Sequence, residues 1–381
     1  MKRERDHDVG NRGRTSGGVE SRNTGNCNFF VDFSENPPPP AVADRDNADR
    51  YETDPRRPRP APSPSRPEKK VKKKRKKGWL IFLLLLLLIV GGAYYLFSGL
   101  SIKPLSKDLT ALGIDPAIEE RYKDAGITNV ALFGVDTRDY ETDTGRSDAI
   151  MIISVDNKNN RLKLTSVLRD SYVSIEGHGQ EKITHAYVYG GPELAIKTLN
   201  QNFRLNIKNY VTVNFAQMAG VVDAIGGVDI EISEAERIQI NGLANQEGMW
   251  APEIPSAGSV HLNGTQATAF SRIRSIDTDT ARAGRQRMVM EAMLHSVKET
   301  SVFKYPGLVR EVLSHTETSV DYAGVARLSP AVLFGDASME QYIVPSEEDT
   351  PYGGEVDGSW VWTFDIPAAT ERLHRFIYGD V

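Results

Sequence analysis

Apolar and polar residues are distributed very unevenly along this chain, and its first fifth differs from the rest. Residues 1–77 contain almost no apolar clusters, carry PPPP at 37–40 and continue as DPRRPRPAPSPSRP. A segment of this composition cannot bury enough apolar surface to fold. We therefore predict that residues 1–77 form a disordered tail rich in Pro, Arg and Lys.

One uninterrupted apolar run follows the tail. Residues 79–97 read WLIFLLLLLLIVGGAYYLF, nineteen positions without a charge. At ~1.5 Å per helical residue this run spans most of a bilayer core of ~30 Å. A cleaved signal peptide is the alternative, but no A-x-A cleavage site is evident after the run. The pattern predicts a single transmembrane helix over 79–97.

The charge distribution predicts the orientation of this anchor in the cell membrane. KKVKKKRKK at 69–77 lies directly before the apolar run, and residues 1–77 hold 20 Lys and Arg against 12 Asp and Glu. Basic residues next to a membrane span stay on the cytoplasmic side. We expect a cytoplasmic N terminus and an extracytoplasmic domain, and no nucleic-acid partner. The single cysteine, Cys27, lies in the tail, so the outer domain forms no disulfide.

Alternating short elements are predicted for the outer part of the chain. Residues 98–125 suit a stalk with a short helix, and residues 126–381 form the extracytoplasmic domain. Strand patterns cover 130–135, 149–155, 162–167, 210–215 and 228–232, with a turn at 156–160, and helical patterns cover 192–202, 216–225, 265–270 and a long last helix that begins at Arg285. Interleaved elements with a hairpin predict an α/β fold, a mixed central β-sheet covered by helices on both faces.

Two carboxylates stand at the ends of neighbouring predicted strands. Asp136 closes one strand and Asp148 opens the next, around the charged loop DTRDYETDTGRSD. Hard carboxylate oxygens suit Mg²⁺ or Mn²⁺, which take their remaining ligands from water and substrate phosphate. A loop of ordinary surface acids is the alternative. The spacing alone does not decide between them.

Basic residues gather around the same predicted strand ends, and guanidinium groups bind phosphate oxygens bidentately. The candidates are Arg138, Arg146, Arg169, Lys182, Arg272 and Arg274, followed by Arg285 and Gln286 at the predicted helix start. If RIR is extended, Arg272 and Arg274 project from one face and reach one anion, whereas in a helix they do not. Free N–H groups at a helix start favour an anion as well. Surface ion pairs are the alternative for any single arginine.

Several other chemistries are excluded by the sequence. It contains no G-x-S-x-G elbow, no Walker A loop and no H-E-x-x-H motif, and the outer domain has no cysteine for a nucleophile or a zinc site. The histidines show no ligand spacing. Serine and cysteine hydrolases and zinc enzymes are therefore not expected.

Seven ordered segments carry a resemblance to a known family: FGVDTR, GRSDAIMI, SVLRDSYVSI, KITHAYVYGG, VNFAQMAGVVDAIGGVDI, LNGTQATAFSRIR and AGRQRM. Together they resemble the LytR-CpsA-Psr family of Gram-positive cell-envelope proteins, over about 127–300 and on to about 377. The resemblance implies a phosphotransferase that moves an anionic glycopolymer, such as teichoic acid or capsule, from a polyprenyl pyrophosphate carrier to peptidoglycan. The new link is a phosphodiester.

The resemblance also implies roles for the residues. Asp136 and Asp148 become Mg²⁺ ligands, and Arg146, Arg169, Lys182, Arg272, Arg274, Arg285 and Gln286 become pyrophosphate ligands. Leu168 departs from the family pattern, which has a proline before the arginine. For the general base, the candidates are Asp148 and Asp170.

An apolar slot for the lipid is a hypothesis for Val213, Phe215, Met218 and Val222, although apolar residues of this kind more often belong to the plain core. Two other functions stay open. A polyprenyl pyrophosphate hydrolase would use the same site with water as the acceptor, and a membrane-anchored transcriptional attenuator would signal through the tail. The tail lacks a helix-turn-helix pattern.

Overall fold

The computed structural model describes residues 102–137, 145–245, 250–274, 276, 278–336 and 338–379. The predicted tail, the predicted anchor and Arg138 lie outside these residues. Within them, no helix is both long and apolar enough to cross a bilayer.

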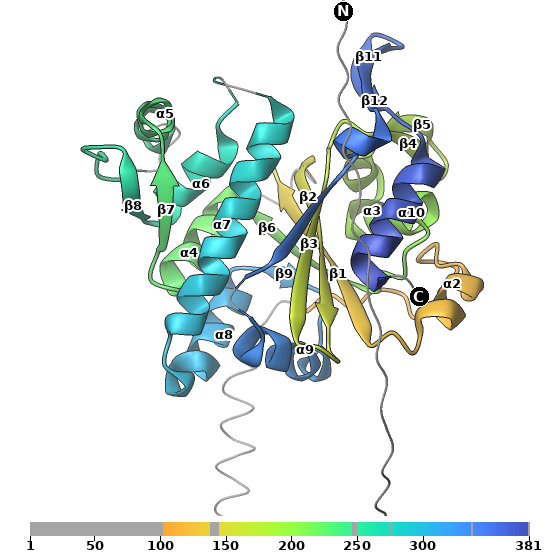
Figure 1. The fold of residues 1–381 in the computed structure, drawn as a ribbon, viewed down its shortest axis with the longest axis horizontal. Coiled ribbons are helices and arrows are strands. Elements are labelled where there is room, and N and C mark those ends of the chain that lie inside the picture. Colours follow the sequence, from red (N-terminus) through yellow and green to blue (C-terminus); the bar gives the residue numbers. More distant parts are fainter. Residues whose placement is uncertain are drawn as a thin grey trace, which may run out of the picture. The chain divides into compact units, whose positions relative to one another are not determined.

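The centre of the described part is a six-stranded sheet with the order β10-β3-β2-β1-β6-β9 (Figure 1). Its strands are β1 (Ile127–Val135), β2 (Ser147–Asp156), β3 (Arg161–Val167), β6 (Asn209–Asn214), β9 (Glu317–Thr318) and β10 (Glu340–Val344). The pairs β1–β2, β2–β3 and β6–β9 are antiparallel, whereas β1–β6 and β3–β10 are parallel. The predicted mixed sheet and the hairpin that turns at 156–160 are confirmed.

Helices and three small hairpins complete the domain. The helices are α2 (Pro116–Tyr122), α3 (His185–Phe203), α4 (Phe215–Ala224), α5 (Glu234–Ala244), α6 (Gly264–Arg272), α7 (Asp279–Glu299), α8 (Tyr305–Ser314), α9 (Tyr322–Phe334) and α10 (Ile366–Tyr378), with short 3₁₀ turns η1 (Val302–Lys304) and η2 (Glu347–Asp349). The hairpins pair β4 (Tyr172–Ile175) with β5 (Gly179–Lys182), β7 (Val228–Ile232) with β8 (Gly258–Leu262), and β11 (Tyr352–Val356) with β12 (Ser359–Thr363).

Alternation along the strands places a core on each face of the sheet. Phe133 and Ile152 are buried in the core that α3 and α10 cover. Met151, one residue from Ile152, points to the opposite face, where α7 and α9 contribute Leu294 and Ala331 to a second core. Successive strand side chains point to opposite faces, so apolar strands of this kind need cover on both sides. Figure 1 shows the helices in these two layers.

The segment predicted as a stalk contributes to the domain core. Leu112, Ile118 and Tyr122 are buried in the same cluster as α3 and α10. The Tyr122 ring stacks on Tyr378 of α10 with a centroid separation of 3.7 Å. From about Leu112 onward, this segment therefore packs as part of the domain.

The long helix α7 begins earlier than the sequence pattern predicted. Thr278 caps it by accepting a hydrogen bond from the N–H of Ala281, and the helix starts at Asp279. The prediction of a start at Arg285 was wrong because Gly284 is accommodated inside the helix rather than ending a loop. Arg285 and Gln286 consequently lie in the second turn, away from the free N–H groups. The helix is also not the last, since α8, α9 and α10 follow.

Candidate active site

A cavity of about 370 Å³ lies between the sheet and the helices that cover β1, β2 and β6. Its charged residues are Asp136, Asp148, Arg272, Arg274 and Arg282, with Gln286 beside them. Its apolar residues are Leu132, Phe133, Ala149, Met151, Val211, Val213, Phe215, Met218, Val221, Leu243, Met290, Met293 and Val312. A pocket with a long apolar wall and a few convergent charges suits an amphipathic ligand.

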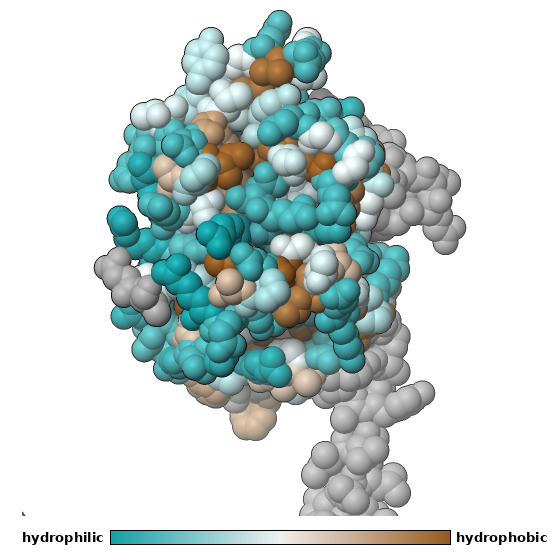
Figure 2. Space-filling view, turned by 90° about the vertical axis from the view of Figure 1, so that its right-hand side faces the viewer, coloured by the Kyte–Doolittle hydropathy of each residue, from teal (hydrophilic) through white to brown (hydrophobic). Residues whose placement is uncertain are grey.

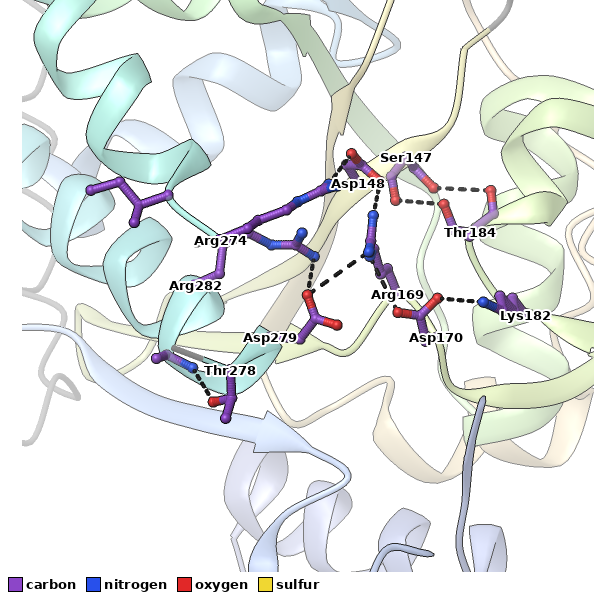
Figure 3. Close-up of polar contacts among 12 residues, drawn as sticks. Ser147, Asp148, Arg169, Asp170, Lys182, Thr184, Arg274, Thr278, Asp279 and Arg282 are labelled. Atoms are coloured by element: carbon purple, nitrogen blue, oxygen red, sulfur yellow. Dashed lines mark hydrogen bonds and ion pairs between the residues drawn. The ribbon is translucent and has the colours of Figure 1, made fainter. Parts of the chain in front are cut away.

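Asp148 is the centre of the charged cluster (Figure 3). One carboxylate oxygen accepts a hydrogen bond from Arg169 Nη1 at 2.7 Å, and the other accepts one from Arg274 Nη2 at 2.5 Å. Burial alone would raise the pKa of Asp148, but the hydrogen bond from Arg169 and the charges of Arg169, Arg274 and Arg282 outweigh it and lower the pKa. Asp148 is therefore a carboxylate at neutral pH.

Backbone hydrogen bonds hold the two candidate metal ligands near each other. The carbonyl of Arg146 accepts the N–H of Asp136 and the N–H of Asp148, each at 3.0 Å. The β1–β2 register shifts between Gly134 and Val135, so the strand ends are re-aimed just before Asp136. The side chain of Arg146 is exposed and does not line the cavity. The structure thus places the backbone of Arg146, rather than its guanidinium, at the cluster.

A second carboxylate stands behind Arg169. Asp170 is buried and lies 3.3 Å from Arg169 Nε and 3.1 Å from Lys182 Nζ. Neither Asp170 nor Lys182 lines the cavity. Their charges therefore orient Arg169 from behind, while Arg169 bridges Asp170 and Asp148. Leu168, the departure from the family pattern, is buried and donates its N–H to the carbonyl of Val344 at 2.8 Å.

Arg272 and Arg274 reach the cavity by a different route from the predicted one. Arg272 is the last residue of α6, so RIR is not extended at its first position, and the condition under which the two arginines would share one strand face is not met. Ile273 then leaves the helix with ψ of 125°, and this turn brings Arg274 toward Asp148. The guanidinium of Arg272 lies over the ring of Phe215, 4.0 Å from its centroid. Both arginines line the same cavity.

Arg282 is a cavity residue that sequence reasoning missed. It is buried, its Nη2 lies 3.1 Å from Asp279, and its buried Nη1 has no hydrogen-bond partner in the described part of the chain. Burial, together with the charges of Arg169 and Arg274, lowers the pKa of Arg282 to about 10. A buried guanidinium that lies among other cations and has one N–H donor without a partner favours the binding of an anion in the cavity. Its spacing of four residues from Gln286 was the available sequence signal.

Arg285 lies on another side of α7. Its Nη2 donates to the carbonyl of Ile273 at 2.9 Å, and its Nη1 lies 3.4 Å from Glu236 of α5. Arg285 does not line the cavity, whereas Gln286 does. The contacts of Arg285 tie α5, α6 and α7 together. Its contact with pyrophosphate stays a prediction, and Arg138 lies outside the described residues.

The apolar wall corresponds closely to the predicted lipid slot. Val213, Phe215 and Met218 line the cavity. Val222 instead belongs to the core shared by α4, α5, α6 and the β7–β8 hairpin. The slot therefore lies between β6 and the start of α4, with Met290 and Met293 of α7 on its other side.

A family model described as the LytR_cpsA_psr family matches residues 105–375. The chain belongs to the LytR-CpsA-Psr family. The polyisoprenyl-teichoic acid–peptidoglycan teichoic acid transferase TagU of Bacillus mycoides (strain KBAB4) is 30% identical over 307 residues, which cover 77% of this chain and 93% of the relative. TagU of Oceanobacillus iheyensis is 33% identical over 272 residues, which cover 68% and 78%.

Solved structures of similar fold include TagT bound to LIIa-WTA, with a TM-score of 0.54 and 26% identity over 67% of this chain and 92% of that one. TagT with bound octaprenyl pyrophosphate lipid has a TM-score of 0.51 and 23% identity over 74% and 97%, which supports the fold alone. The fold of this LytR-CpsA-Psr member is thus shared with TagT, for which structures with LIIa-WTA and with octaprenyl pyrophosphate lipid are known.

The carboxylates of this LytR-CpsA-Psr member fit a magnesium ion that shares its ligands with substrate. Within residues 102–137, 145–245 and the later described segments, no group of three or more His, Cys, Asp and Glu is placed to hold a metal. Asp136 and Asp148 nevertheless line one cavity, and Mg²⁺ is typically held by one or two carboxylates plus substrate phosphates. The side chain of Arg274, which pairs with Asp148, is half-exposed.

Proposed function

We propose that this protein transfers an anionic glycopolymer, a teichoic acid or a capsule-like polymer, from a polyprenyl pyrophosphate carrier to peptidoglycan. The observation that carries the proposal is that one and the same cavity has a cationic part and an apolar wall. Such a cavity binds a pyrophosphate and its isoprenoid together. The relatives named as teichoic acid transferases support the polymer class.

In this proposal the arginines bind the pyrophosphate and neutralise its charge. Arg274 and Arg282 reach the anion directly, Arg272 stacks on Phe215 beside it, and Arg169 stays fixed to Asp148. Preorganised cations at a developing charge cost no reorganisation during the reaction. Asp136 and Asp148 would hold Mg²⁺, which supplies further charge neutralisation and orientation of the phosphates when bound.

The proposed reaction is a phosphoryl transfer to a sugar hydroxyl. The acceptor oxygen attacks the phosphorus that carries the glycopolymer, a P–O bond to the acceptor forms, and the P–O bond to the lipid phosphate breaks. Polyprenyl monophosphate leaves with the bonding electron pair. The hydroxyl proton passes to a carboxylate, and Asp148 is the candidate that lines the cavity, whereas Asp170 is held between Arg169 and Lys182.

We also propose that the domain works outside the cell membrane, held by the apolar run at 79–97. Peptidoglycan and lipid-linked polymers meet at that surface, and the basic cluster at 69–77 favours a cytoplasmic tail.

The test is incubation of the full chain with a pyrophosphate-linked lipid saccharide, Mg²⁺ and peptidoglycan oligomers, beside Asp148→Asn. Saccharide joined to the glycan by the wild type and not by the variant is the expected result. Cleavage of the lipid at the same rate with and without glycan would instead identify a hydrolase. No cleavage and no transfer by the folded wild type would refute the proposal.

A further inference from the structure

The cavity has a direction within the fold, and its apolar end lies at one edge of the sheet. Asp136 directly follows β1, Asp148 lies at the start of β2 and Arg282 lies in the first turn of α7. Leu132, Val211 and Met293 lie toward the opposite ends of β1, β6 and α7. Leu132 pairs with Val211 in the sheet register, and Val211 pairs with Thr318 of β9. The apolar part of the cavity therefore approaches β9.

The N-terminal chain enters the domain at this same edge. Ile102 forms a parallel bridge with Thr318, and Lys103 donates its N–H to the carbonyl of Thr318 at 2.8 Å. The apolar run at 79–97 ends only five residues before Ile102. An extended chain advances at most ~3.6 Å per residue, so the end of the predicted anchor is within roughly 18 Å of β9. If the run at 79–97 spans the membrane as proposed, the bilayer surface lies close to the apolar end of the cavity.

Two strongly exposed phenylalanines project near the same end of the domain. The relative exposure of Phe303 in η1 is 92%, and that of Phe334 at the end of α9 is 75%. Both lie near the C-terminal end of α7. Phe303 does so because η1 comes directly after this helix, and Phe334 does so because Lys298 of α7 donates to the carbonyls of the neighbouring Gly335 and Asp336. Large apolar side chains at this exposure mark an interaction surface when they gather.

Helix α8, between η1 and β9, has the pattern of a helix that lies on a surface. Leu308, Val309, Val312 and Leu313 recur at helical spacing and are half-buried, and Val312 lines the cavity, so the apolar stripe of α8 reaches from the cavity wall toward the surface. Lys304 is exposed beside Phe303, as expected for a basic side chain at the level of lipid headgroups. Figure 1 shows α8 and α9 at the end of the domain away from β11 and β12, and hydrophilic residues cover most of the face in Figure 2.

We propose that η1, α8 and the end of α9 form a membrane-docking face, defined by Phe303, Leu308 and Phe334, that rests on the bilayer. The anchor alone would tether the domain without orienting it. Docking turns the apolar end of the cavity toward the lipid, so a long isoprenoid passes from the bilayer into the cavity without crossing water. This benefit rests on the proposed function, whereas the docking itself does not.

The test measures membrane depth and needs no catalytic activity. Full chains carrying Cys27→Ser and one spin-labelled cysteine, at Lys304, Asp336 or Glu355, are reconstituted into vesicles of phosphatidylethanolamine and phosphatidylglycerol. Glu355 is exposed on β11, at the other end of the domain, and serves as the matched control. Labels at 304 and 336 should collide more with oxygen than with the water-soluble nickel chelate, and the label at 355 should show the reverse. Equal nickel accessibility at all three sites would overturn the docking face.

A second experiment links docking to lipid access. The double variant Phe303→Ser and Phe334→Ser should slow the reaction of a long-chain lipid substrate in vesicles several-fold, and leave a short-chain substrate in detergent unaffected. Trp250→Ser, which removes another strongly exposed aromatic residue, should change neither rate. Unchanged or equal losses with both substrates would contradict a role in lipid access. Failure of the proposed transferase would remove these rates while leaving the depth measurement valid.

Discussion

Arg282→Gln separates anion binding from stability at the candidate active site. One pKa unit corresponds to about 1.4 kcal/mol, so the fall of the Arg282 pKa from its ordinary value to about 10 corresponds to about 3 kcal/mol against the charged guanidinium in the fold. Replacing the arginine with glutamine removes this unfavourable buried charge but also loses some packing contacts. We expect a net gain of about 1–2 kcal/mol in the free energy of unfolding without ligand, a rise of several degrees in Tm.

The same substitution should weaken ligand binding. A hydrogen bond from a charged donor contributes about 1.5–3 kcal/mol, so the Kd for a soluble prenyl pyrophosphate should rise roughly 10- to 150-fold. Calorimetric titration measures the Kd, and thermal unfolding without ligand measures the Tm. Arg282→Lys keeps the charge and should retain more of the affinity. An unchanged Kd in Arg282→Gln would refute the assignment of this residue to the anion.

Three further predictions concern neighbouring groups. Asp148 has a lowered pKa in the fold, so the stability that it contributes is present above its unfolded pKa of about 4 and is lost as the pH falls through the lower folded value. Asp148→Asn should therefore reduce the loss of unfolding free energy at acid pH, measured by unfolding at a series of pH values. An unchanged loss at acid pH would contradict the ion pairs of Asp148. Arg285→Ala leaves Glu236 without this partner and should lower the free energy of unfolding by about 2–3 kcal/mol. Its loss of pyrophosphate affinity should be smaller than that of Arg282→Gln. A larger loss in Arg285→Ala than in Arg282→Gln would show that Arg285 is the ligand. Asp136→Ala should raise the Mg²⁺ concentration needed for half-maximal transfer by about tenfold or more, and chelation of the metal should stop transfer by the wild type; transfer that persists in excess chelator would remove Mg²⁺ from the account.

Local pattern was enough to predict the part of the site that depends on strand ends. Asp136 and Asp148 could be placed because β1 and β2 are buried runs whose ends are marked by charge. The place of Val213 and Phe215 in the cavity wall could be predicted for a related reason, since β6 leads directly into α4. These features require only neighbouring residues.

Which helical residues reach the site depends on the direction of each side chain around the helix axis. This direction in turn depends on the residue at which the helix starts. With α7 starting at Asp279, Arg282 and Gln286 share the face toward the cavity, and Arg285 faces α5 and α6. A prediction that starts the helix at Arg285 leaves Arg282 outside it and therefore misses this arrangement. The pKa of Arg282 also depends on the charges of Arg169 and Asp148, which are more than a hundred residues away in the sequence, and no local pattern reports such neighbours.

The most direct test of the central claim follows the phosphorus atom next to the saccharide. The full chain is given a lipid-linked saccharide labelled at that phosphate, with Mg²⁺ and peptidoglycan oligomers, and the glycan is recovered and analysed by mass spectrometry. Transfer predicts the label in a phosphodiester between saccharide and glycan, with unlabelled polyprenyl monophosphate released. Label found only on free saccharide phosphate, or remaining entirely on the lipid, would contradict it.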